Sequence, residues 1–381
     1  MNISKLKTNI FDNLKYYLAS LTVIISFSEV LAENSIIFKF LSYFLYVCWA
    51  LYLINFKKIP TISFQLLIIS LSFFFLSASL INFSIDIFLK YTLILISIFF
   101  ASLNKKKLEK KFFRFSILYP YIFLLIVGVF QILILNFAPT LAHKQLSWHG
   151  RPIGLSVEPT FFSQQILMLA VLSENFELTN QLSKRKKLAL NLFLFILIVL
   201  SRTRTSILGG IIFFAVSNRK ISFKKLYLFL LSFLSTFAFV PYLRNSFEIL
   251  SAKLLSFNST NSFGTRSILF EDMIFQINNS SIFGNGFFSY LKQTNIDNIA
   301  LMGGSLYANL PLSFVFTLGI GSIPLFIFIS LLLIDAFKRC KKMPLFLIVI
   351  FSILMPFMYT SFGFTSLFLA SYTKKYSYKS N

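Results

Sequence analysis

The apolar residues of this 381-residue chain gather into long blocks, separated by short clusters of lysine and arginine. Several blocks have roughly 18–25 residues, the length with which a helix crosses about 30 Å of hydrocarbon. The pattern predicts helices over 16–32, 36–54, 60–80, 85–103, 112–137, 156–174, 188–201, 206–217, 226–243, 306–334 and 344–372. The last block is expected either as one helix or as two that meet near Pro356. We therefore predict an all-α polytopic membrane protein with about eleven or twelve crossings, forming one membrane domain over 1–381.

Basic residues give the chain its orientation. The net charge is +23, from 36 basic and 13 acidic residues. In a soluble protein this excess would suggest nucleic acid, but here the basic clusters flank apolar blocks, as the positive-inside rule describes. We expect no nucleic-acid partner, a lipid bilayer as the surroundings, and a cytoplasmic N-terminus with the cluster 184–187 on the same side. An even number of crossings would also place the C-terminal lysines there, which favours twelve.

Two predicted outer loops are longer than a turn, namely 138–155 and 244–305. In the second loop, apolar residues between Ile268 and Ile277 recur at helical spacing, and Thr265 stands where a helix cap is expected. Glycines at 284 and 286 follow as a turn signal. The large loop is therefore expected to carry a short amphipathic helix on the outer membrane surface.

A few arginines break the positive-inside pattern and are candidates for chemistry. They are Arg151, Arg202, Arg204, Arg244 and Arg266. An arginine at membrane depth is costly unless it faces a partner or a polar cavity. Two interpretations stay open, because these side chains either reach the outer headgroups or form an anion site. Arg202 and Arg204 lie in the hydroxyl-rich run 201–206, which favours a phosphate or diphosphate held by guanidinium groups.

Acidic and metal-binding residues are sparse. Glu158 stands at the start of a predicted helix, with Pro159 in the first turn. Its carboxylate either complements the positive helix end or lies near Arg151, as a general base or as a group that holds an arginine in place. The only histidines, His143 and His149, have no metal-ligand spacing, so we expect neither a metal nor another cofactor.

Four local motifs, in this order and placement, resemble the O-antigen polymerase (Wzy) family within the wider O-antigen polymerase and ligase superfamily. They are Arg151–Gly154 with Glu158–Thr160, Ser201–Thr205, Gly264–Arg266 with Ser281–Phe287, and Asn309 followed by Gly319–Gly321. One departure concerns the pair Ala308–Asn309, where many relatives, especially ligases, carry His-Asn. The departure favours a polymerase over a ligase.

The resemblance implies a GT-C-like glycosyltransferase in the bacterial inner membrane, with its active site facing the periplasm. It implies inverting, metal-independent transfer of a growing glycan from undecaprenyl diphosphate to a new lipid-linked repeat unit. A chain-length regulator protein would be a further partner. Two alternatives stay open: a glycan ligase of the same superfamily, and a polysaccharide flippase or other transporter, although the chain shows no internal repeat of the kind many transporters have.

The same resemblance suggests roles for individual residues. The catalytic candidates are Arg151, Glu158 and Arg266. The substrate-binding candidates are Arg202, Arg204, Tyr307 and Asn309. The arginines would hold the donor diphosphate and stabilise the leaving group, while Tyr307 and Asn309 would line the sugar site.

Overall fold

The computed structural model of the chain describes residues 14, 16–24, 41, 44–45, 48, 110–137, 147–148, 151–155, 159–217, 274–275, 277–279, 282–284, 315, 318–324, 326–327, 330–331, 334 and 369. The helices predicted over 60–80, 85–103 and 226–243 lie outside these residues. By its backbone contacts the chain divides into two compact units. Unit 1 is 1–39, 109–258 and 342–349, and unit 2 is 40–108, 259–341 and 350–381.

The described part of the chain is mostly helical, which confirms the helical part of the predicted fold class. In unit 1 a helical stretch runs through α6 (Lys110–Phe113), a π-helical segment (Arg114–Leu118) and α7 (Tyr119–Phe137). Of the described helices, Lys110–Leu135 is long and apolar enough to cross a membrane, judged by length and composition. Pro120 explains the π-helical segment. In a regular α-helix the proline ring would clash with the carbonyl group four residues earlier, and the wider π turn relieves this clash.

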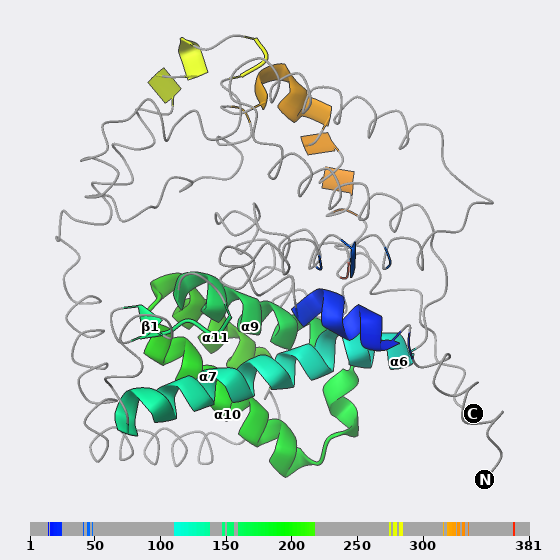
Figure 1. Cartoon of the computed structure of the whole chain (residues 1–381), viewed down its shortest axis with the longest axis vertical. Helices are drawn as coiled ribbons and strands as arrows, with labels where there is room; N and C mark the ends of the chain where they lie inside the picture. The colour runs from blue at the N-terminus through cyan, green and yellow to red at the C-terminus, as the bar shows by residue number, and fades with distance from the viewer. Residues whose placement is uncertain are drawn as a thin grey trace. The chain divides into compact units, whose positions relative to one another are not determined.

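Three further helices complete a bundle with α7 (Figure 1). They are α9 (Pro159–Asn175), α10 (Lys184–Ser201) and α11 (Arg204–Ser217). The helix α9 contacts α7, α10 and α11 and is buried continuously from Phe162 to Asn175. A two-turn stretch at 16–24 also belongs to unit 1, and its Tyr16 and Tyr17 rings contact Phe115.

Helix boundaries in unit 1 follow the predicted blocks closely. The largest difference is at α10, which begins at Lys184, four residues before the predicted start at 188. Ser183 caps this helix, because its Oγ accepts a hydrogen bond from the Lys186 backbone N–H at 3.4 Å. Lysine and arginine are good helix formers, so the basic cluster is the first turn of α10 and not part of the loop before it.

A small antiparallel sheet departs from the all-α prediction. Its strands are β1 (Ser147–Trp148) and β2 (Arg151–Pro152), with Trp148 paired to Arg151. Both lie in the predicted loop 138–155. Strands of two residues are too short for the alternation of apolar and polar positions by which a strand is recognised. The strand β2 contacts α7, α9 and α10, so the hairpin is docked on the bundle.

In unit 2 the described residues support the predicted helix and glycine turn of the large loop. Ile274, Phe275 and Ile277 are helical, and Gly284 follows in a turn at φ +81°. The predicted helix 306–334 contains a 3-10 turn at Gly319–Gly321. There the Ile320 N–H donates to the Ile282 carbonyl at 2.9 Å, which ties the loop to this helix. Gly319 is required, since a Cβ there would lie 2.1 Å from the same carbonyl oxygen.

Candidate functional site

Four buried hydroxyl groups tie α9 to the turn between α10 and α11. The Ser163 Oγ lies 2.8 Å from the Thr203 Oγ1 and 2.8 Å from the Ser206 Oγ. The Thr203 Oγ1 also lies 2.9 Å from the Ser201 Oγ. All four side chains are buried, and satisfied polar networks of this kind specify a single arrangement of the groups that they join. The turn 201–206 is therefore held in a defined position against α9.

Arg202 occupies the tight turn that this cluster fixes. The helix α10 ends at Ser201, and Arg202 follows in the left-handed conformation at φ +55°, with its N–H donating to the Val199 carbonyl. This conformation costs about 1–2 kcal/mol for a residue with a side chain, and such strain is often found at functional sites. The Arg202 side chain is half-buried. The next helix, α11, begins at Arg204, of which the structure describes the backbone.

Arg151 is carried by β2 and is half-buried. Three residues later, Gly154 packs against the ring of Phe162 in the first turns of α9, at φ +60°. The side chain of Gln131 in α7 holds the same segment through three hydrogen bonds to the backbone of Ile153 and Gly154. The hairpin that bears Arg151 is thus docked where α7 and α9 meet.

These contacts bring Arg151 and Arg202 to one end of the unit-1 bundle. We call it the arginine end and define it by Arg151, the turn 201–206 and the first turns of α9 and α11. Gly128 in α7 admits the Phe162 ring and the Leu197 side chain, which shows that α7, α9 and α10 meet at this level. Two helices, α9 and α11, begin here, so their N-terminal ends add positive partial charge to that of the arginines.

The groups available at the arginine end suit an oxyanion. Guanidinium groups and helix N-termini bind phosphate through several N–H donors at once. Throughout the ranges that the structure describes, no three His, Cys, Asp or Glu side chains group as metal ligands. The guanidinium groups of Arg151 and Arg202 are the groups at this end that suit an anionic ligand.

Other predicted site residues lie outside the described part of the chain. They are Glu158, Arg266, Tyr307 and Asn309, together with Arg244. Glu158 directly precedes α9 in the sequence, and α9 begins at Pro159, whereas the predicted helix began at 156. The remaining assignments stay predictions from the sequence.

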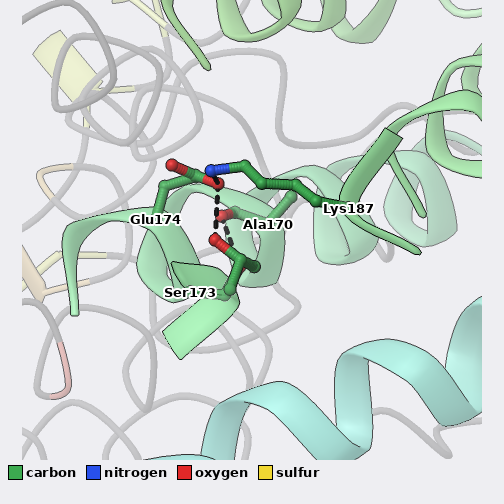
Figure 2. Close-up of polar contacts among 5 residues, drawn as sticks. Ala170, Ser173, Glu174 and Lys187 are labelled. Atoms are coloured by element: carbon green, nitrogen blue, oxygen red, sulfur yellow. Dashed lines mark hydrogen bonds and ion pairs between the residues drawn. The ribbon is translucent and has the colours of Figure 1, made fainter. Parts of the chain in front are cut away.

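The opposite end of the bundle has a buried ion pair that the sequence reading did not single out. In Figure 2, Lys187 at the start of α10 reaches Glu174 at the end of α9, with 2.7 Å between Nζ and Oε1. The same Oε1 accepts a hydrogen bond from the Thr179 hydroxyl at 2.7 Å. The Glu174 side chain is only 2% exposed, whereas that of Lys187 is 22% exposed. The sequence did offer a signal for this ion pair, because Glu174 is an acidic residue in a predicted apolar helix and is followed shortly by the basic cluster 184–187.

No protein-family model, curated protein or solved structure matches this chain.

Proposed function

We propose that this protein is a polytopic inner-membrane glycosyltransferase of the O-antigen polymerase type, with a GT-C-like arrangement of about eleven or twelve crossings. It would join undecaprenyl-diphosphate-linked oligosaccharide repeat units at the periplasmic face, by inverting transfer without a metal. The single observation that carries the proposal is the arginine end, where Arg151, Arg202 and the first turn of α11 share one end of a helix bundle.

The geometry of α10 supports this orientation in a bilayer. The basic residues Lys184–Lys187 form its first turn, and Ser201 is its last residue. Its apolar part, 188–201, rises about 21 Å, less than the roughly 30 Å thickness of a bilayer core. The lysines and the arginine end lie at opposite ends of this apolar part. Under the positive-inside rule the lysines would face the cytoplasm, and the arginine end would then face the periplasm.

A lipid-linked diphosphate fits a site at this depth. Its tail would stay among the lipids, while the two negative charges and the non-bridging oxygens of its diphosphate would meet the guanidinium groups at the membrane surface. Arginine is suited to this task because it stays charged at any working pH and presents a planar fork of N–H donors. Lipid-linked phosphates also diffuse in the plane of the membrane, so a lateral approach to the bundle end serves both substrates.

The proposed reaction is a single displacement at the anomeric carbon of the donor glycan. The acceptor hydroxyl oxygen forms the new glycosidic bond as the bond to the diphosphate oxygen breaks, with inversion. Arg151 and Arg202, joined by Arg204 and Arg266, would bind the donor and stabilise the charge that collects on the leaving diphosphate. Glu158 would take the acceptor proton as a general base. In its alternative role Glu158 would orient an arginine, and the acceptor proton would pass to solvent water. Tyr307 and Asn309 would line the sugar site.

The test is reconstitution of the purified protein in liposomes with a synthetic undecaprenyl-diphosphate repeat unit. A ladder of glycan lengths is expected, unchanged by a chelator and at least 10-fold slower with Arg151→Ala or Arg202→Ala. Arg185→Ala is the matched control, because Arg185 is exposed in the first turn of α10 at the opposite end. Normal ladders with both arginine variants would overturn the proposal.

The same preparation separates the alternatives that share these substrates. A ligase would make no ladder but would transfer a preformed glycan to a lipid A-core acceptor. A transporter would move the lipid-linked unit across the bilayer without making a glycosidic bond. A partner that regulates chain length would change the length distribution of the ladder and not the rate of the first transfer.

A further inference from the structure

Gln131 is a buried polar side chain in an otherwise apolar helix. The α7 sequence around it is Ile-Val-Gly-Val-Phe-Gln-Ile-Leu-Ile-Leu, and the Gln131 side chain is 4% exposed. An amide removed from water without partners is costly, so its contacts are informative. Its Oε1 accepts from the Gly154 N–H at 2.8 Å and from the Ile153 N–H at 3.2 Å. Its Nε2 donates to the Gly154 carbonyl at 2.7 Å.

These three bonds satisfy backbone groups that lie directly after the strand bearing Arg151. Gly154 is at φ +60°, a conformation that disrupts regular backbone pairing and leaves its N–H and carbonyl to be satisfied elsewhere. The side chain of Gln131 replaces the missing backbone partner with both of its amide functions. Such a bidentate contact fixes the orientation of the segment as well as its distance from α7.

The Phe162 ring packs against the same segment. A Cβ on Gly154 would lie 2.2 Å from this ring, and a Cβ on Gly128 would lie 2.7 Å from it. Both glycines therefore allow α7, the ring and the 153–154 backbone to approach closely. The residue after Phe162 is Ser163, which holds the turn carrying Arg202. Phe162 and Ser163 of α9 therefore contact both the segment that follows Arg151 and the turn that carries Arg202. Gln131 adds hydrogen bonds to the segment that follows Arg151.

We infer that Gln131 is a positioning residue, which holds the 147–155 hairpin so that Arg151 faces the anion bound at the arginine end. That the ligand is an anion rests on the proposed function, whereas the positioning of the hairpin by Gln131 rests on the hydrogen bonds described above. A displacement of about 1 Å at a charged group that positions substrate costs on the order of 100-fold in rate. Loss of the Gln131 contacts should therefore act on activity through Arg151.

The experiment uses Gln131→Leu in the full chain, reconstituted in nanodiscs. Asn191→Leu is the matched control, because Asn191 is also a buried amide of unit 1 and its Nδ2 has no hydrogen-bond partner among the residues described. Hydrogen exchange is followed by mass spectrometry over the peptide 147–155, and polymerisation is measured for each variant with and without Arg151→Ala.

The expected result is faster exchange of 147–155 in Gln131→Leu alone, with kcat/KM lowered about 10- to 100-fold. Arg151→Ala should then have at most a small further effect in the Gln131→Leu background, because coupled residues are not additive. Unchanged exchange, or an equal effect of Arg151→Ala in both backgrounds, would overturn the inference. If the wild type makes no glycan while exchange of 147–155 rises in Gln131→Leu, the polymerase proposal fails. The positioning of the hairpin by Gln131 is then still supported.

Discussion

Two left-handed residues allow the role of Arg202 to be separated from the stability of its turn. Among the residues that the structure describes, Glu177 at φ +54° and Arg202 at φ +55° are the non-glycine residues with positive φ. Each lies beyond a helix end, Glu177 after α9 and Arg202 after α10. They lie at opposite ends of the bundle, so they form a matched pair in which only one residue belongs to the arginine end. Each is replaced by alanine and by glycine.

The size of the effect follows from the backbone conformation. Alanine and glycine both remove the original side chain, so their difference isolates the Cβ. A Cβ in the left-handed region costs about 1–2 kcal/mol, and glycine offsets about 0.5–1 kcal/mol of this through its larger loss of chain entropy on folding. The glycine variant should be more stable than the alanine variant by about 0.5–1 kcal/mol at both positions.

Two measurements on the same four proteins test this reasoning. Unfolding by denaturant in detergent micelles gives the free energies, and ladder formation in liposomes gives the activities. Both Arg202 variants should lose activity together, at least 10-fold, although the glycine variant is the more stable. Both Glu177 variants should keep their activity. Equal stability of glycine and alanine at both sites would refute the backbone argument, and recovery of activity by Arg202→Gly would refute a role for the guanidinium.

Three further predictions concern packing and buried polar groups, each measured by the midpoint of thermal unfolding in detergent. Gly154→Ala should destabilise the protein by about 2–5 kcal/mol, because it adds left-handed strain and overpacking. Gly210→Ala should be neutral or stabilising, because the nearest contact of its Cβ would be the end of the flexible Ile198 side chain at 3.2 Å. Equal midpoints for the two variants would contradict this prediction. Lys187→Met should be more destabilising alone than together with Glu174→Gln, because alone it leaves a buried carboxylate without its cation; additive losses would count against a buried ion pair. Ser163→Ala should destabilise by about 1–3 kcal/mol, since it leaves two buried hydroxyls short of a partner, and an unchanged midpoint would argue against the hydroxyl cluster.

Helices of unit 1 were predictable because their signals are local. The apolar run that became α7 and the hydroxyl-rich break between α10 and α11 can both be read along the chain. The start of α10 was missed because basic residues were taken as loop, although a lysine-rich turn with a serine cap is a good helix start. The 3-10 turn at Gly319–Gly321 depends on a contact with Ile282, which local sequence does not contain.

The arginines of the arginine end were predicted from the sequence, but the side chains that hold their backbone segments in place were not. Arg151 and Arg202 stood out because they break the charge pattern, and the structure brings their backbone segments to the same bundle end. Gln131 and Ser163 escaped the sequence reading because their partners are 22 to 43 positions away along the chain. The hairpin was missed because two-residue strands carry no periodicity. A glutamine inside an apolar helix was the one signal that pointed towards such a contact.

The central claim is that the arginine end binds the diphosphate of a lipid-linked glycan, and direct binding tests it most closely. The measurement is equilibrium binding of a fluorescent undecaprenyl-diphosphate repeat unit to the protein in nanodiscs, for the wild type, the double variant Arg151→Ala/Arg202→Ala and the control Arg185→Ala. Loss of both arginines should weaken binding at least about 100-fold, with the control unchanged, because two charge-assisted contacts at about 1.5–3 kcal/mol each are removed. Equal affinity for all three proteins would contradict the account.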